Sequence, residues 1–162
     1  MSYFEKFAKE NIKDPSAIGL VDFMVKVDEQ YDIFKTYDTN CYFEIMFLSV
    51  KSTAKGRGIG TALVTTSAKL AQDLKTKNEN KNSPIDVKTD AKEFKNSEAL
   101  NLVPKVVSAI FTSRFSQKCG QRSGFTEVLK NSYTEFSHNG KTYAEIIGPD
   151  HPYSALCVKK LN

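Results

Sequence analysis

The residues best suited to chemistry in this sequence are three glycines at alternate positions, Gly56, Gly58 and Gly60. They lie between an apolar run at residues 42–50 and an amphipathic stretch that opens with Thr61. This order predicts a strand, a glycine-rich turn and the start of a helix. Backbone N–H groups in such a turn, together with the positive end of the helix dipole, can hold a phosphate or pyrophosphate. Glycine suits these positions because no Cβ keeps the phosphate oxygens away.

Other glycine-rich turns differ from this one in spacing. A Walker loop carries Lys and then Ser or Thr directly after its last glycine, whereas Thr61 and Ala62 follow Gly60, which excludes it. A dinucleotide-binding turn needs a small residue where Leu63 stands, and the loop that begins at Val50 is too long for it, so its support is weak. A purely structural turn stays open as an alternative, although each glycine within a helix would cost about 0.5–1 kcal/mol relative to alanine.

The composition is that of one globular domain, and we expect residues 1–162 to form it. The chain has 162 residues, of which 40% are hydrophobic and 26% charged, which is enough to bury a core of its own. No apolar stretch approaches the length of a membrane span, and the first residues lack the apolar core of a signal peptide. We therefore expect a cytoplasmic protein with no membrane partner.

The numbers of cysteines and histidines and the net charge limit the classes of ligand that we expect. Cys41, Cys119 and Cys157 are an odd number without metal-like spacing, and there are only 2 histidines, so the sequence suggests neither a disulfide framework nor a metal site. The net charge of +4 favours an anionic ligand. It is too small for a dedicated nucleic-acid binder, and the lysines of residues 75–95 are mixed with acidic residues, so we expect no nucleic-acid partner.

The first half of the chain predicts two helices, a strand and a third helix. The first helices cover residues 3–10 and 16–34, the second being opened by Asp14 and Pro15. Four of its residues repeat at helical spacing and are expected to pack on a sheet: Leu20, Met24, Val27 and Tyr31. The strand at residues 41–50 is apolar on both faces, as in a central strand covered on two sides. The helix after the glycine turn has an apolar stripe expected to be buried, formed by Ile59, Leu63, Leu70 and Leu74.

The second half of the chain predicts a second central strand, a helix and further strands. The strand covers residues 103–111, and the helix that follows ends at Gly124 in a left-handed conformation. Further strands are expected at residues 125–136, 141–147 and 154–161, with a hairpin turn at Asn139 and Gly140. Residues 86–99 hold too few apolar residues for an assignment. The predicted fold class is therefore α/β (α+β), with a mixed central sheet flanked by helices.

Residues 55–60 resemble the coenzyme-binding pattern of the GCN5-related N-acetyltransferases (GNAT), with Lys55 in place of the usual first Arg or Gln. The likeness extends to residues 48–50, 112–118 and 149–161, which look like the insect arylalkylamine N-acetyltransferases. A full member of that family carries a first strand, a helix with the glutamate proposed as general base, and a hairpin, all ahead of the segment similar to residues 3–34. The resemblance therefore implies a GNAT-like sheet that lacks the first strands.

The resemblance implies direct transfer of an acetyl group from acetyl-CoA to a small arylalkylamine, without a metal. By position, the N–H groups of six residues would hold the pyrophosphate: Gly56, Arg57, Gly58, Ile59, Gly60 and Thr61. The strand edge at Leu48, Ser49 and Val50 would bond the pantetheine arm as an added strand does. Lys55 or Lys118 would meet the phosphates as a point charge.

Three residues are candidates for the proton transfers that this reaction needs. Thr112 and Ser116, expected one turn apart on the same helix face, match a pair of hydroxyls proposed in insect relatives to move a proton or to protonate the thiolate. Thr112 or Ser113 could instead only cap the helix. Glu44 is the substitute for the missing glutamate, at a position where some acetyltransferases keep a base; otherwise it is a strand residue that faces solvent or a lysine. His151 is expected in a surface loop.

The expected absence of the first strands leaves a second hypothesis. Without the usual base, the chain would be a catalytically impaired remnant that binds acyl-CoA or serves as an interaction module. An exposed sheet edge and an apolar helix face would also favour self-association. Both hypotheses predict coenzyme binding, and they differ in turnover, since proton removal by a base typically contributes about 10²–10⁴-fold to the rate.

Overall fold

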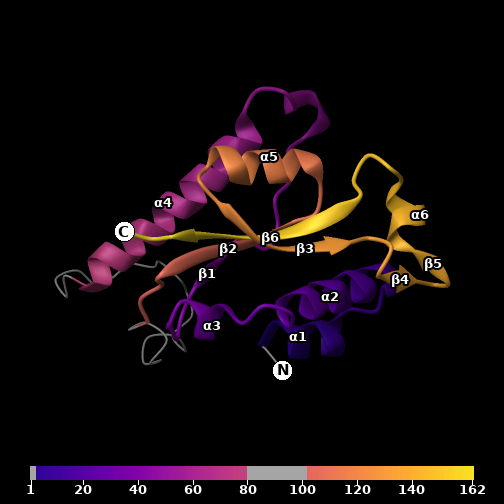
Figure 1. Ribbon diagram of the computed structural model, residues 1–162, viewed down its shortest axis with the longest axis horizontal. Coiled ribbons are helices and arrows are strands. Elements are labelled where there is room, and N and C mark those ends of the chain that lie inside the picture. Colours follow the sequence, from indigo (N-terminus) through magenta and orange to yellow (C-terminus); the bar gives the residue numbers. More distant parts are fainter. Residues whose placement is uncertain (1–2, 80–101) are drawn as a thin grey trace.

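The computed structural model describes residues 3–79 and 102–162, and in it a four-stranded sheet lies between two layers of helices (Figure 1). The strands are β1 (Phe43–Glu44), β2 (Val106–Phe111), β6 (Tyr153–Lys160) and β3 (Thr126–Ser132), in that spatial order. β1 runs parallel to β2, whereas β6 is antiparallel to both β2 and β3. The predicted mixed sheet flanked by helices is therefore confirmed.

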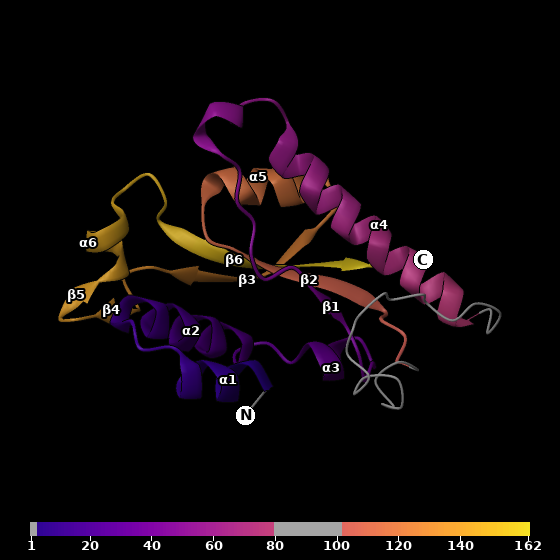
Figure 2. The same cartoon turned by 180° about the vertical axis from the view of Figure 1, so that it is seen from behind.

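Helices cover both faces of this sheet (Figure 2). On one face lie α1 (Tyr3–Asn11), α2 (Pro15–Asp28) and α3 (Ile33–Thr36), and on the other lie α4 (Ile59–Glu79) and α5 (Arg114–Arg122). Within the described residues, no helix combines the length and the apolar character needed to cross a bilayer.

The helix predicted at residues 16–34 is in fact two helices. It starts at Pro15 with the Asp14 carboxylate as its cap, as expected. It ends at Asp28 because a second cap follows, in which the Asp32 carboxylate accepts a hydrogen bond from the Lys35 N–H at 2.9 Å and opens α3. The sequence could have predicted this break from Asp32, because an Asp often caps the start of a new helix.

The face of α2 that meets the sheet supplies one core. Its members are Phe23, Met24 and Val27 of α2, with Tyr133 and Leu156. Met24 and Val27 are therefore core residues as predicted, and Tyr31 packs against this core while half-buried. The prediction was wrong for Leu20, which is 44% exposed and lies at the rim of a cavity described below.

The buried stripe of α4 also differs from the predicted one. Its buried residues are Val64, Ala68 and Ala71, which share a core with Val107, Ala109 and Phe111 of β2. In the predicted stripe, Leu63 is 43% and Leu70 is 51% exposed, and Ile59 and Leu74 are only half-buried. Both stripes have helical spacing, so periodicity could not choose between them; the small alanines let α4 lie close to the sheet.

The predicted central strand at residues 41–50 is wrong in position and extent. Only Phe43 and Glu44 form β1, at the edge of the sheet. The Ile45 N–H still donates to the Ser108 carbonyl at 2.9 Å, but beyond it the chain parts from β2. This separation opens a space between two neighbouring segments of backbone.

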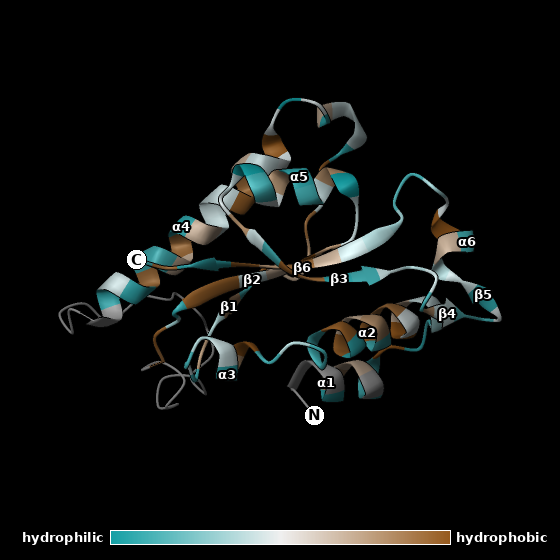
Figure 3. Ribbon diagram, viewed as in Figure 1, coloured by the Kyte–Doolittle hydropathy of each residue, from teal (hydrophilic) through white to brown (hydrophobic). Residues whose placement is uncertain are grey.

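The strands predicted at residues 103–111, 125–136 and 154–161 are confirmed with shorter bounds. β2, expected at residues 103–111, is central and consists largely of hydrophobic residues between the helix layers (Figure 3). β3 and β6 fall within the ranges expected for them, apart from Tyr153 at the start of β6. Residues 86–99 lie outside the described part of the chain.

A separate hairpin, β4 (Ser137–His138) and β5 (Lys141–Thr142), lies at one end of the sheet. Asn139 has φ 50° and Gly140 has φ 76°, the left-handed conformations of a two-residue hairpin turn. The predicted turn is confirmed.

The predicted strand at residues 141–147 is wrong beyond Thr142. The Glu145 N–H donates to the Thr142 hydroxyl at 3.2 Å, and the Glu145 carboxylate accepts from the Thr142 N–H at 2.6 Å. This capping box opens the short helix α6 (Tyr143–Ile147).

Candidate functional site

The glycine-rich turn follows a short 3₁₀ helix, η1 (Ser52–Ala54), and leads into α4. Gly56 has φ 78° and Gly58 has φ 77°, a left-handed conformation that residues with a Cβ rarely adopt. A Cβ added at either position would meet no atom within 4 Å. The backbone conformation of the turn, rather than crowding, therefore requires glycine at both positions.

Gly60 is needed for a different reason, the close approach of two helices. It lies in the first turn of α4, where an added Cβ would come within 3.2 Å of the Cys119 Sγ of α5. The Thr65 and Ser123 hydroxyls, 2.9 Å apart, join the same two helices. Glycine at this position thus brings the start of α4 beside α5.

The turn presents a set of unpaired donors. The first N–H of this region that bonds back to the backbone is that of Ala62, which donates to the Gly58 carbonyl at 3.0 Å. The N–H groups of residues 56–61 have no backbone acceptor within the described part of the chain. They belong to the residues just before and in the first turn of α4, a helix of 21 residues that has no acidic side chain in its first turn. Unpaired donors and the positive end of the helix dipole together suit an anion.

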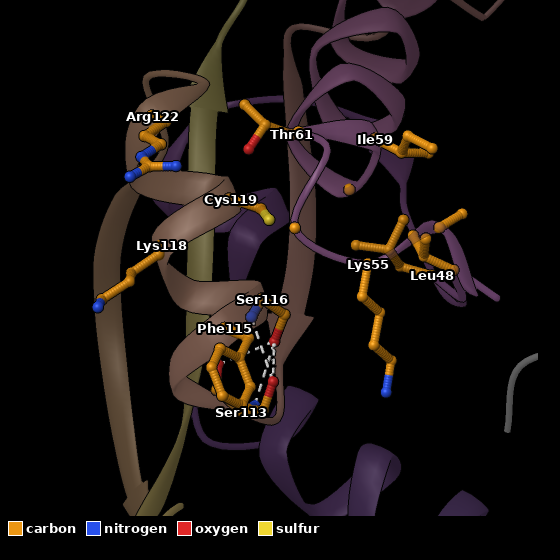
Figure 4. A pocket seen from close by; sticks show the side chains of 15 residues that line it. Leu48, Lys55, Ile59, Thr61, Ser113, Phe115, Ser116, Lys118, Cys119 and Arg122 are labelled. Atoms are coloured by element: carbon orange, nitrogen blue, oxygen red, sulfur yellow. Dashed lines mark hydrogen bonds between the residues drawn. The ribbon is translucent and has the colours of Figure 1, made fainter. Parts of the chain in front are cut away.

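A cavity of about 480 Å³ separates this turn from α5 (Figure 4). Most residues predicted for the coenzyme line it: Leu48, Val50, Lys55, Gly56, Gly58, Ile59, Gly60, Thr61 and Lys118. Ser49 and Arg57 are exposed and do not line it. Segments that are far apart in the sequence therefore meet around one space, as the predicted site requires.

Sequence reasoning missed several residues of this cavity. Arg122 and Phe115 line it from α5, as does Cys119, which points toward the turn (Figure 4). Arg122 could have been found, because it follows the predicted Lys118 by four residues and so lies on the same helix face. The Cys119 contact could not, since it depends on how α4 and α5 pack.

A second cavity, of about 160 Å³, adjoins the first where the chain parts from β2. Leu48 and Ser116 line both cavities. The remaining lining is mainly apolar: Leu20, Met24, Ile45, Met46, Phe47, Ile110, Phe111 and Thr112. The hydroxyls of Thr112 and Ser116 are thus at a largely apolar site.

Thr112 and Ser116 reach this cavity in a different way from the one predicted. Thr112 precedes the helix, and Ser113 is its N-cap, so the two candidates do not share a helix face. Ser116 belongs to a capping box, in which its N–H donates to the Ser113 hydroxyl at 3.1 Å and its hydroxyl accepts from the Ser113 N–H at 3.1 Å. The predicted alternative, that Ser113 caps the helix, is confirmed.

Glu44 lies on the α2 side of the sheet edge and is half-buried. Burial and, to a smaller extent, the negative charge of Asp28 together raise its pKa to about 7. Glu44 lines neither cavity. Met46, which lines the smaller one, is two residues along, a distance of about 6–7 Å in extended chain.

The two histidines have structural contacts. The Arg114 N–H donates to the His151 Nδ1 at 3.4 Å, and the His151 ring packs edge-on against Phe115 with centroids 5.5 Å apart. His138 lies on β4, where its Nδ1 would be only 2.7 Å from a Cβ added at Gly19. His151 thus holds the start of α5, and His138 fits the hairpin against α2.

Comparisons of sequence identify no relative, because no protein-family pattern matches the chain and no curated protein matches it. Comparison of structures, in contrast, identifies proteins with a similar fold. Arylalkylamine N-acetyltransferase 2 of Aedes aegypti is similar with a TM-score of 0.67 at 21% identity, over 98% of this chain and 61% of that one. The mosquito arylalkylamine N-acetyltransferase like 5b has a TM-score of 0.67 at 15% identity, with the same coverage.

A Drosophila melanogaster polyamine N-acetyltransferase, which forms N-acetylagmatine, has a TM-score of 0.63 at 16% identity. It too is covered over 61% of its length, by 98% of this chain. The chain thus spans about three fifths of these proteins. At such identities the likeness is one of fold, and this chain has the fold of the GCN5-related N-acetyltransferases.

Proposed function

We propose that this chain binds acetyl-CoA in the larger cavity and transfers its acetyl group to a small arylalkylamine in the smaller one. The observation that carries this proposal is the junction of the two cavities. One cavity has an anion-binding turn at its side and the other is largely apolar, and Leu48 and Ser116 line both. A thioester at this junction would lie between a coenzyme and an amine.

The coenzyme is held in two parts. Its pyrophosphate accepts hydrogen bonds from the N–H groups of residues 56–61, and Lys55, Lys118 and Arg122 add positive charge. Its pantetheine arm lies along Leu48 and Val50, where the chain has parted from β2 and its backbone groups are open to an added strand.

The amine lies in the apolar cavity. The Aedes aegypti protein is an arylalkylamine acetyltransferase and the Drosophila protein acts on polyamines. Among residues 3–79 and 102–162, no carboxylate lines the small cavity, whereas Leu20, Met24 and Phe47 do. This lining favours an aromatic group over a second positive charge.

Proton transfer is assigned to Glu44 and to the hydroxyls. Attack requires a neutral amine, and a carboxylate whose pKa is about 7 is well matched to take the proton near neutral pH. Because Glu44 lies short of the cavity, a water molecule carries the proton between them. Ser116, supported by Thr112, protonates the leaving thiolate.

The position of Glu44 also supports the second candidate function. If no water connects Glu44 to the amine, the chain binds the coenzyme and does not turn over. It then serves as an acyl-CoA-binding remnant or an interaction module.

Coenzyme A titration tests the shared part of both functions, with two matched glycine variants. In Gly58→Ala, the left-handed conformation at φ 77° is strained and the turn amides shift. Gly148→Ala also places a Cβ at a positive φ, 84°, at a residue that does not line the cavity, and neither added Cβ meets an atom within 4 Å.

We expect Gly58→Ala to weaken coenzyme A binding at least about tenfold, or ~1.4 kcal/mol, and Gly148→Ala to leave it unchanged. Calorimetry gives the affinity, and thermal unfolding confirms that both variants fold. Equal binding by the two variants would contradict the assigned turn.

A further inference from the structure

An aromatic cluster joins α2 to the hairpin and to α6, which lie beside one end of that helix (Figure 2). The ring of Phe23 on α2 lies 5.9 Å from that of Tyr133 and 5.5 Å from that of Tyr143, measured between centroids. Phe136 is closer, with its ring centroid 4.9 Å from that of Phe23. Ring pairs at these distances attract one another beyond the area that they bury. The cluster therefore holds α2 against the end of the sheet.

The two tyrosine hydroxyls of the aromatic cluster bond to opposite walls of the smaller cavity. The Tyr143 hydroxyl donates to the Gly19 carbonyl at 2.9 Å. Gly19 precedes Leu20, which lines the cavity from α2. The Tyr133 hydroxyl donates at 2.6 Å to the carbonyl of Thr112, which lines the cavity directly after β2. Each hydroxyl thus fixes the backbone of one wall.

The two tyrosines are also held at a fixed separation. The Tyr143 N–H donates to the Phe136 carbonyl at 2.9 Å, and the Ala144 N–H donates to the Tyr133 carbonyl at 3.0 Å. The rings of Tyr133 and Tyr143 meet edge-on with their centroids 6.3 Å apart. Because packed interiors transmit displacements, a shift of one tyrosine moves the other. The distance between the two cavity walls therefore depends on the aromatic cluster.

Gly19 allows the hairpin to approach α2 closely. A Cβ added at Gly19 would lie only 2.7 Å from the Nδ1 of His138 on β4. Glycine thus leaves the carbonyl of this position within reach of the Tyr143 hydroxyl. On the same helix, Met24 follows Phe23 of the aromatic cluster and lines the smaller cavity, so the contact with the hairpin lies next to the cavity wall.

We infer that Tyr143 is a positioning residue that, held against Tyr133, sets the width of the smaller cavity and so favours an amine with one aromatic ring over one with two. This inference rests on the proposed function, in which that cavity takes the amine. Neither tyrosine lines the cavity, so both act through its walls. The cavity volume of about 160 Å³ is close to that of an apolar protein cavity of about 150 Å³ that binds benzene.

Methionine methyl signals test the position of the wall without any need for turnover. The chain has 3 methionines, of which Met24 and Met46 line the smaller cavity. The protein is labelled with carbon-13 at its methionine methyl groups, and each NMR signal is assigned by substituting its methionine with leucine. In Tyr143→Phe we expect the Met24 signal to shift by more than its line width, because α2 loses a bond to α6. Phenylalanine keeps the ring, so the shift reports movement of α2 and not the loss of a ring current.

Tyr153→Phe is the matched control. Tyr153 packs against the core on the α4 side of the sheet and lines neither cavity. The control removes a tyrosine hydroxyl on the face of the sheet away from α2, and it should leave the Met24 and Met46 signals in place. Thermal unfolding confirms that both variants fold.

Kinetics give the second readout, with phenethylamine as the one-ring amine and tryptamine as the two-ring amine. In Tyr143→Phe we expect the KM for phenethylamine to rise about three- to tenfold, the size of effect that one hydrogen bond supports. The KM for tryptamine should change less, and the KM for acetyl-CoA should not change. A loss of folded protein alone would lower the apparent kcat for both amines equally and would leave every KM as it is.

The outcomes separate this inference from the proposed function. Unchanged Met24 and Met46 signals in Tyr143→Phe overturn the inference whatever the activity. Shifted signals with an equal change of KM for both amines overturn the link to amine size. Shifted signals in a chain that transfers no acetyl group support the positioning role of Tyr143 and overturn the proposed reaction instead.

Discussion

At the scale of single residues, Glu44 is a half-buried carboxyl group, and this burial makes its charged form unfavourable. The folded chain raises its pKa to about 7 from an ordinary value of 4.5, chiefly through burial. Below about pH 4.5 the group is protonated in both the folded and the unfolded chain, so it costs nothing. As the pH rises toward 7, the unfolded chain releases its proton first, and the stability of the folded chain falls.

Replacing Glu44 with glutamine removes this loss. We expect Glu44→Gln to be more stable than the parent by about 1–2 kcal/mol at pH 8, after allowance for partial exposure to solvent, and equal to it at pH 4. Urea unfolding at the two pH values measures the difference. A variant that is less stable at pH 8 would show that Glu44 has a stabilising partner.

At the scale of elements, packing decides what periodicity leaves open. The glycine turn, β2 and the hairpin at Asn139 were predictable, because each depends on neighbours in sequence. Most residues that line the larger cavity were predicted only from the family resemblance of residues 48–50, 55–60 and 112–118. The buried stripe of α4 was not, since Leu63 and Val64 fit two stripes of equal spacing. The break after Asp28 likewise depends on a local hydrogen bond, that of the Asp32 cap, which competes with a continuous apolar repeat.

Substitutions on α4 test which stripe is buried. We expect Val64→Ala to cost about 1–3 kcal/mol, because Val64 is completely buried against β2. Leu70→Ala removes a larger side chain but should cost less than about 0.5 kcal/mol, because half of it is exposed. Denaturant midpoints compare the two variants. A larger loss of stability in Leu70→Ala than in Val64→Ala would show that the stripe predicted from the sequence is the buried one.

At the scale of the whole molecule, the sheet has an open edge in the described residues. β1 pairs with β2 on one side and with no described strand on the other. On α4, Leu63 and Leu70 present exposed apolar surface. An open edge and exposed leucines both favour association with another chain.

We therefore expect the isolated chain to self-associate. Sedimentation velocity should show a weight-average sedimentation coefficient that rises with concentration over the micromolar range. The double variant Leu63→Lys with Leu70→Lys should reduce this rise if the helix face contributes. A coefficient that stays that of a monomer at every concentration would contradict the expectation.

We propose that the two joined cavities bring acetyl-CoA and an aromatic amine together, with Glu44 acting as the base through water. A thiol-release assay with acetyl-CoA and either tryptamine or agmatine tests it most directly, with Glu44→Gln measured alongside. We expect turnover with tryptamine, little with agmatine, and a loss of about 10²-fold or more in Glu44→Gln. Coenzyme binding without thiol release from either amine would contradict the claim and leave the acyl-CoA-binding remnant as the function.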